Sequence, residues 1–297
     1  MKPLALAGDI VTQQEAIDYY QSLPELEQVE FAEYKYELWQ EDPKEWSPLI
    51  TLEQLSKRPD LSIDWYCEDF IPVGGKVLLS AEPKCGKTIL LFHILKAVIT
   101  GQTFLGKRCT PAKVIYFTEQ TEHEFKRQVR EIPGLLGNPN FYVLLAEEVP
   151  PELRSWRQLL QFTEKKMQLI GAHIVVFDTF LGMAHLPPDG ENDSATIQNC
   201  IDDANFLFRN RYLSVVFVHH ARKSYTDNDG RRGPISMQSI RGSSAFVGGV
   251  GHVIVMSCPD YKQPVRVLNF FGRYLHGQEM DLSLNDKQYH LKAFRRG

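Results

Sequence analysis

The sequence has few cysteines, and their positions exclude several classes of protein. No two of them form a C-x-x-C pair, and they are spread over the chain as Cys67, Cys85, Cys109, Cys200 and Cys258. This spacing argues against a zinc module and against a disulfide framework. Thiols stay unpaired in a reducing cytoplasm, which is the setting we expect.

Long hydrophobic runs are also missing. No stretch of about 18 apolar residues occurs, which excludes a membrane-spanning helix. Met1 to Val11 contains one lysine and too short an apolar run for a secretory signal. The sequence shows no internal repeat and no low-complexity segment. We therefore expect a cytoplasmic protein that does not contact membranes.

The charge is unevenly distributed. Residues 1–50 carry eleven acidic and three basic residues, a net charge of −8, whereas residues 51–297 carry 26 acidic and 30 basic residues, a net charge of +4. Apolar residues make up 43% of the chain, which is enough for a packed core. The sequence therefore predicts an acidic extension over residues 1–50 and a mildly basic domain over residues 51–297.

The acidic extension has helical patterns. Thr12–Glu15 has capping-box spacing, and Glu25–Trp39 alternates acidic with apolar residues. Asp42–Pro48, which contains two prolines, is interpreted as a linker. Two interpretations stay open: a solvated amphipathic helix resting on the domain, or an arm that docks on a neighbouring subunit or a protein partner.

The domain is organised around one segment, KVLLSAEPKCGKTILLFHILKAVIT, from Lys76 to Thr100. Its first apolar run predicts a buried strand, and its second half predicts a long helix from about Lys87 to Ile99. The loop between them reads A-x-x-x-x-G-K-T. It matches the phosphate-loop pattern G-x-x-x-x-G-K-[ST] except that Ala81 replaces the first glycine.

Each residue type in this loop has a chemical reason. Backbone N–H groups surround the phosphates, and Gly86 permits their close approach. Lys87 reaches the β- and γ-phosphates, and the hydroxyl of Thr88 binds Mg²⁺. The sequence predicts a nucleoside triphosphate site made of Ala81, Glu82, Pro83, Lys84, Cys85, Gly86, Lys87, Thr88 and Ile89.

The rest of the domain alternates strand and helix patterns. This alternation predicts an α/β fold with a largely parallel sheet between helices. The predicted strands are Val77–Ser80, Lys113–Thr118, Phe141–Leu145, His173–Asp178 and Ser214–His219, and the predicted helices are Glu122–Glu131, Glu152–Ile170 and Ser194–Asn210. Later runs predict antiparallel strands at His252–Ser257, Val265–Phe271, Glu279–Leu284 and Gln288–Ala293. Trp65 and Phe70, before the first strand, either cover the adenine or belong to the core.

Two of these strands end in carboxylates suited to catalysis. Asp178 ends the apolar run HIVVFD, where it can hold Mg²⁺ through water. Glu119 ends the run VIYFTE, where it can orient and deprotonate the water that attacks the γ-phosphate. We interpret Glu122 and Glu124 instead as a solvated first turn of the next helix.

A third strand ends in two histidines followed by a loop. One histidine is an ordinary strand end, and the other can sense the γ-phosphate. The loop over 222–241 is rich in Gly, Ser, Asp and Arg. It predicts phosphate contacts with a nucleic acid through Arg222, Lys223, Arg231 and Arg232, with a solvated loop as the alternative.

Taken together, these segments resemble the RecA-like ATPases of the plasmid RepA replicative-helicase type. The resemblance covers roughly residues 60–290 and rests on WYCEDFIPVGGKVLLSAEPKCGKT, the F-D-T strand end, VFVHHARK and IRGSSAF. It implies a RecA-like core, a ring that is usually a hexamer, and ATP bound between neighbours. The implied roles are phosphate and Mg²⁺ binding by Lys87 and Thr88, water activation by Glu119, Mg²⁺ binding by Asp178 and γ-phosphate sensing by His220.

The same resemblance implies a trans-acting arginine and a DNA channel. Arg273, in the late segment F-F-G-R, resembles the arginine finger donated to a neighbouring subunit, and Arg241 is the alternative. Arg231 and Arg232 would face single-stranded DNA in the central channel. The sequence contains no zinc-binding or primase-like segment, which excludes a combined helicase-primase.

Three classes of function follow from these patterns. The first is a DNA-stimulated ATPase that moves along or remodels single-stranded DNA in replication of a plasmid, phage or other mobile element. The second is an ATP-gated regulatory or assembly ATPase that recruits partners through its acidic N-terminus. The third, a small-molecule kinase, would have no use for Glu119 after the second strand.

Overall fold

The computed structural model describes residues 51–57, 64–187, 189–208, 212–221, 240, 245–260, 263–275, 277–285 and 287–295. The chain divides into two units, Met1–Leu61 and Ser62–Gly297. In the first unit, helix α3 (Leu52–Ser56) begins at a capping box formed by Thr51 and Gln54. The helices and linker predicted within residues 1–50 lie outside the described residues. The domain boundary predicted after residue 50 therefore stays a prediction.

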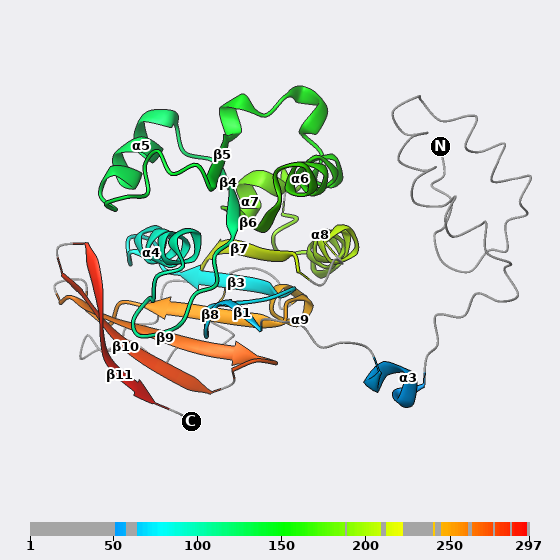
Figure 1. Ribbon diagram of the computed structural model, residues 1–297. Coiled ribbons are helices and arrows are strands. Elements are labelled where there is room, and N and C mark those ends of the chain that lie inside the picture. The colour runs from blue at the N-terminus through cyan, green and yellow to red at the C-terminus, as the bar shows by residue number, and fades with distance from the viewer. Residues whose placement is uncertain are drawn as a thin grey trace, which may run out of the picture. The chain divides into compact units, whose positions relative to one another are not determined.

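One large sheet forms the frame of the second unit (Figure 1). Within the described residues, nine strands run in the order β11-β10-β9-β8-β3-β7-β6-β4-β5, and β1 and β2 form a separate pair. The separate pair is β1 (Trp65–Cys67) and β2 (Ile71–Pro72); the large sheet contains β3 (Lys76–Ala81), β4 (Lys113–Thr118), β5 (Phe141–Leu145), β6 (Ala172–Asp178), β7 (Ser214–His220), β8 (His252–Ser257), β9 (Val265–Gly272), β10 (Gln278–Asn285) and β11 (Gln288–Arg295).

The predicted α/β fold is confirmed. Strands β8, β3, β7, β6, β4 and β5 are parallel, and helices connect most of them along the chain. The described helices of this unit are α4 (Lys87–Thr100), α5 (Glu122–Arg130), α6 (Trp156–Ile170), α7 (Phe180–Ala184), α8 (Ser194–Leu207) and α9 (Ala245–Gly249), with short 3-10 turns at Ala146–Glu148 and Pro151–Leu153. Because the strands are parallel, the carboxyl ends of β3, β4, β6 and β7 meet at one edge of the sheet.

The direction of β8 differs from the prediction. The sequence placed this strand in an antiparallel group, but β8 is parallel to β3, with Val77 opposite His252 and Ala81 opposite Met256. The antiparallel pairings that the large sheet does contain, among its described strands, are those of β8 with β9, β9 with β10 and β10 with β11. The reason is that β7 and β8 are not joined by a hairpin: the chain returns through α9 and enters β8 at the same end as β3.

Two helix boundaries also differ from the prediction. Helix α6 begins at Trp156, not at Glu152, because the Ser155 side chain accepts the N–H of Gln158 and so caps the helix there. Helix α8 ends at Leu207, within the predicted Ser194–Asn210. No described helix combines the length and the apolar character needed to cross a membrane.

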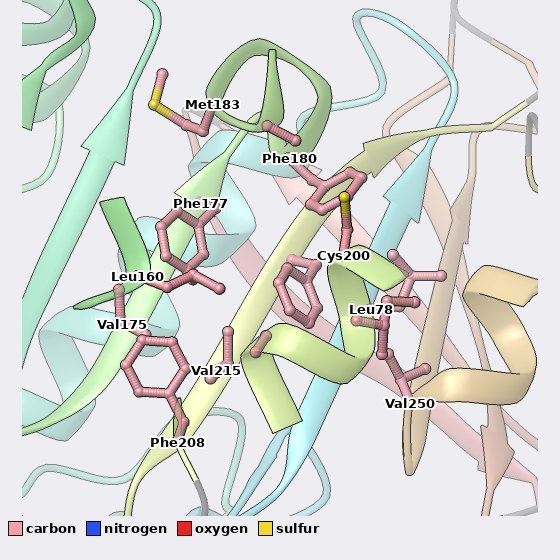
Figure 2. Close-up of a cluster of buried hydrophobic side chains, with 14 of the residues drawn as sticks. Leu78, Leu160, Val175, Phe177, Phe180, Met183, Cys200, Phe208, Val215 and Val250 are labelled. Carbon is pink, nitrogen blue, oxygen red and sulfur yellow. The ribbon is translucent and has the colours of Figure 1, made fainter. Parts of the chain in front are cut away.

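The core on one face of the sheet combines aliphatic side chains with a cluster of aromatic rings (Figure 2). The Phe177 ring stacks on Phe117, 5.1 Å between centroids, and meets Trp156 edge-on at 4.9 Å. Phe180 in turn packs edge-on against Phe217 at 5.6 Å. Helices α6 and α8 cover this face, so Phe117, Phe177 and Phe217 mark the side of the sheet opposite α4.

The other face is covered by α4 and α5 (Figure 1). Phe92 of α4 lies 5.6 Å from the Tyr116 ring of β4 and 5.7 Å from Phe125 of α5. Helix α4 is apolar on nearly all sides, which fits a helix that contacts the sheet, α5 and β11. Its His93 ring meets Tyr289 of β11 at 6.2 Å, where β10 and β11 curl towards the helix.

Candidate active site

The phosphate loop (Ala81–Thr88) connects β3 to the first turn of α4. Ala81 is the last residue of β3 and pairs with His220 of β7 and with Met256 of β8. Because Ala81 is part of a strand, this position does not need the conformational freedom of glycine. Gly86 does: its φ is +95°, and a Cβ there would lie 2.6 Å from the Tyr289 hydroxyl.

Lys87 points along the loop towards the end of β7. Its Nζ donates to the backbone oxygen of His219 at 2.9 Å, and the residue is 8% exposed. Burial lowers the pKa of Lys87, and the negative charges of Asp178 and Glu119 oppose that shift. Lys87, Asp178 and Glu119, three of the residues that the sequence assigned to the chemistry, are therefore close enough to interact electrostatically.

Asp178 ends β6, which is separated from β3 by β7. The carboxylate is buried and accepts a short hydrogen bond from the Tyr116 hydroxyl at its Oδ2. Burial raises the pKa of Asp178, while the positive charge of Lys87 and the Tyr116 hydrogen bond act to lower it. The site thus contains a carboxylate whose ionised form depends on two specific partners.

Glu119 directly follows β4 and lies against the start of α7. Its backbone N–H donates to the backbone oxygen of Asp178 at 3.2 Å, and its Oε1 accepts a hydrogen bond from the Thr179 hydroxyl at 3.3 Å. A Cβ at Gly182 would lie 2.0 Å from Glu119 Oε2, so only glycine leaves room for this carboxylate. Glu119 is exposed, and its predicted role in activating water stays a prediction.

Glu122 and Glu124 form the solvated first turn that was predicted. Both are exposed and lie in the first turn of α5. The Lys126 ammonium lowers the pKa of Glu122, and hydrogen bonds from Thr121 lower that of Glu124. Both carboxylates make these contacts at the N-terminal end of α5, whereas Glu119 lies beside Asp178 at the carboxyl end of β4.

The two histidines at the end of β7 lie on opposite faces of the sheet. The His219 ring stacks on Phe246 of α9, 4.9 Å between centroids and 13° between planes, on the face away from α4. Successive strand residues alternate in direction, so His220 lies on the face that α4 covers. It is opposite Ala81 in the register, where the phosphate loop begins. The sensing role implied for His220 stays a prediction.

The family of the chain follows from its similarity to known proteins. Residues 41–225 match the AAA domain, which covers more than half of the chain. The chain belongs to the AAA-domain family of P-loop ATPases. A comparison with curated proteins found no match. The family indicates an ATPase, and AAA ATPases generally use ATP with Mg²⁺.

The oxygen ligands of this AAA domain fit Mg²⁺. This ion takes oxygen ligands and is usually held by one or two protein groups together with substrate phosphates. The Thr88 hydroxyl, in the first turn of α4, and the Asp178 carboxylate are ligands of this kind. The Lys87 ammonium favours the ionised form of Asp178, which is the form that a cation requires.

The predicted nucleic-acid residues all lie outside the described residues. These are Arg222, Lys223, Arg231 and Arg232, together with the alternative finger Arg241. The described residues that flank them are informative: Ala221 forms an antiparallel bridge with Ile240, and the Ala221 N–H donates to the Ala81 oxygen at 2.9 Å. Ala221 and Ile240, which flank the segment 222–239, therefore lie side by side, and Ala221 lies beside the start of the phosphate loop.

Arg273 lies at the opposite end of the sheet from the phosphate loop. Its N–H donates to the Gly251 oxygen at 2.9 Å, just before β8 begins beside Val77. Arg273 is exposed and far from this subunit's own Lys87. Its predicted contact with the nucleotide of a neighbouring subunit stays a prediction.

Phe70 belongs to the core of the domain, and Trp65 is partly buried. Trp65 packs against His252, 5.9 Å between centroids, at the same far end of the sheet. Phe70 is fully buried between Phe104, at 5.3 Å, and Phe270, at 5.8 Å. Phe70 is fully buried and so belongs to the core, whereas for Trp65, which is partly buried, a place beside the adenine stays a prediction.

Three residues near the site were missed by the sequence analysis: Tyr116, Arg266 and Tyr289. Tyr116 contacts Asp178, while Arg266 and Tyr289 contact the phosphate loop. None of them belongs to a motif of fixed spacing. The only sign of them in the sequence was a tyrosine or an arginine within a predicted strand, and in the structure these side chains are buried.

Proposed function

We propose that this AAA-domain ATPase is a motor that uses ATP hydrolysis to move along or remodel single-stranded DNA. The observation that supports this best is the position of Ala221 and Ile240, which flank the segment 222–239. These two residues pair with each other, and Ala221 is bonded to Ala81 of the phosphate loop. This segment carries the basic residues suited to nucleic-acid phosphates. The proposal includes a ring of identical subunits, with Arg273 donated to the neighbouring nucleotide.

The side chains at the site divide the chemistry of hydrolysis among them. When bound, Mg²⁺ would supply positive charge next to the phosphates. Lys87 would bind the β- and γ-phosphate oxygens, and Thr88 and Asp178 would hold the metal, Asp178 through water. Glu119 orients the attacking water and takes its proton. Hydrolysis then needs no covalent intermediate with the protein.

Nucleotide binding can be transmitted to the basic segment through the end of β7. Lys87 donates to the His219 oxygen at 2.9 Å, and Ala221 donates to the Ala81 oxygen at 2.9 Å. Phosphate oxygens compete for the Lys87 ammonium and so change one of these bonds. The change occurs at His219, three residues before Arg222, where the basic segment begins.

Steady-state ATP hydrolysis with and without single-stranded DNA tests this proposal. Lys87→Ala should abolish hydrolysis and weaken Mg–ATP binding, because it removes the charge on the phosphates. Arg231→Ala/Arg232→Ala should keep basal hydrolysis but lose DNA stimulation. It should also flatten the salt dependence of DNA binding by roughly 0.7 for each phosphate that the protein no longer neutralises. Arg127→Ala/Arg130→Ala, which removes two exposed arginines of α5, is the matched control.

The outcomes separate the candidate functions. If the parent hydrolyses ATP but neither binds single-stranded DNA nor responds to it, the motor is wrong. The regulatory or assembly ATPase then replaces it, with the acidic residues 1–50 as the partner-binding segment. Parental hydrolysis by Lys87→Ala would overturn the nucleotide site itself. Loss of DNA binding in the α5 control would show that net charge, and not the segment 222–239, determines affinity.

A further inference from the structure

Two side chains of the C-terminal strands hold the phosphate loop from outside. Arg266 of β9 donates from Nε to the Cys85 oxygen at 2.7 Å, and Tyr289 of β11 donates from its hydroxyl to the Gly86 oxygen at 2.9 Å. Both residues are buried, at 8% and 7% exposed. Consecutive carbonyls of the loop therefore each have a donor from a distant strand.

These two bonds help to set the direction of two N–H groups. The Gly86 oxygen also accepts the Leu90 N–H at 2.9 Å, so Tyr289 is its second donor. In a trans peptide the C=O and the N–H of one unit point in opposite directions. The Cys85 oxygen shares its peptide with the Gly86 N–H, and the Gly86 oxygen shares its peptide with the Lys87 N–H. Holding both oxygens towards the C-terminal strands aims both N–H groups away from those strands, into the concave side of the loop where an anion binds.

The donors themselves are held in place. The Arg266 guanidinium also donates from Nη1 to the backbone oxygens of Gln263, at 2.9 Å, and Val265, at 2.8 Å. The Tyr289 ring meets the His93 ring at 6.2 Å, and His93 Nε2 donates to the Lys287 oxygen at 2.8 Å. The β10–β11 hairpin is thus attached to the second turn of α4. The loop contacts strands that are attached to its own helix.

We infer that Arg266 and Tyr289 are positioning residues for nucleotide binding. They preorganise the N–H groups of Gly86 and Lys87 for the phosphates, so the loop does not have to order itself when the nucleotide arrives. This inference rests on the proposed nucleotide site. It gives the antiparallel strands β9–β11 a role in ATP binding, in addition to extending the sheet.

The test is the variant Tyr289→Phe, which removes one hydroxyl and keeps the ring. The matched control is Tyr66→Phe, because the Tyr66 hydroxyl also donates to a backbone oxygen, that of Tyr212 at 2.7 Å, before β7 begins. Isothermal titration of the full chain with Mg–ADP and Mg–ATP should show binding ~3- to ~10-fold weaker for Tyr289→Phe, the effect of losing one buried hydrogen bond. Tyr66→Phe should bind as the parent does.

Kinetics provide a second measurement that a merely structural role would not reproduce. The N–H groups bind phosphate in both the ground state and the transition state, so their loss should raise KM with kcat nearly unchanged. A smaller folded fraction would instead lower kcat and leave KM unchanged. Arg266→Met, which keeps the aliphatic stem, should change KM in the same direction as Tyr289→Phe.

The outcomes distinguish this inference from the proposed function. Parental nucleotide affinity in Tyr289→Phe, or an equal loss in Tyr66→Phe, overturns the positioning role. The nucleotide site then stands if Lys87→Ala still loses binding. If the parent chain binds neither Mg–ADP nor Mg–ATP, the inference and the proposed function are both overturned.

Discussion

The substitution Gly182→Ala tests the role of Glu119 without changing Glu119. A Cβ at Gly182 would lie 2.0 Å from Oε2 of Glu119, 3.0 Å from its Cδ and 3.4 Å from its Cβ. Carbon–oxygen contacts need about 3 Å or more, so the end of the carboxylate must move by roughly 1 Å. A shift of that size at a reacting group can reduce the rate by about 10²-fold.

The fold should tolerate this change. The atom that must yield is the end of a flexible side chain, and alanine is better than glycine within a helix by up to ~1 kcal/mol. Gly182 lies in α7 and does not have a positive φ. The free energy of unfolding should therefore stay the same or rise. Mg–ATP affinity should also be unchanged, because Glu119 acts on water and not on the phosphates.

Three measurements check this prediction: steady-state ATP hydrolysis, Mg–ATP affinity and thermal unfolding. Gly248→Ala is the matched control, since Gly248 lies in α9 and a Cβ there has open space. It should keep full activity. Parental turnover in Gly182→Ala would refute the assignment of Glu119 as the water-activating group. An equal loss of affinity and turnover would show that the shift disturbs the phosphate loop instead.

Three further predictions follow from the geometry. Glu119→Gln should bind Mg–ATP normally and lose turnover by ~10²-fold or more, because only water activation is removed; equal loss of binding in titrations would mark Glu119 as structural. Arg273→Ala should bind ATP but be inactive, and mixing it with Lys87→Ala should restore some hydrolysis; no rescue at any ratio, with subunit exchange demonstrated, would contradict a shared site. Burial lowers the pKa of His252 from 6.5 to about 4, so the unfolded chain takes up a proton first as the pH falls through that window. Between pH 7 and pH 5 the free energy of unfolding should then drop by about 2 kcal/mol, and His252→Gln should reduce that drop in urea titrations at the two pH values; an unchanged drop would assign it to other groups.

Sequence patterns predicted the parallel core closely because its strands are uniform. Every residue of β3 is buried, so the strand appears in the sequence as a continuous apolar run followed by the loop motif. The direction of β8 was not predictable in this way. An apolar run does not encode its direction, which depends on the path of the chain from β7 through α9.

The contacts around the site could not be predicted for a different reason. Tyr116 meets Asp178 because β4 and β6 pair with Thr118 opposite Asp178, which puts Tyr116 one diagonal step away on the same face. Arg266 and Tyr289 reach the phosphate loop across 181 and 203 residues of chain. Such contacts depend on register and on sheet curvature, and neither is encoded by local spacing.

The bonds at the end of β7 explain why the nucleotide and the basic segment would act on each other. Lys87 is bonded to the His219 oxygen, His220 is opposite Ala81, and Ala221 is bonded to the Ala81 oxygen. Three consecutive residues, the last two of β7 and the residue after it, are thus tied to the two ends of the phosphate loop. Whatever binds the segment 222–239 and shifts this strand end also shifts the backbone on which Lys87 rests. Coupling between two binding sites is reciprocal, so a nucleotide that reorders this strand end must be bound more tightly, or more weakly, when the segment is occupied.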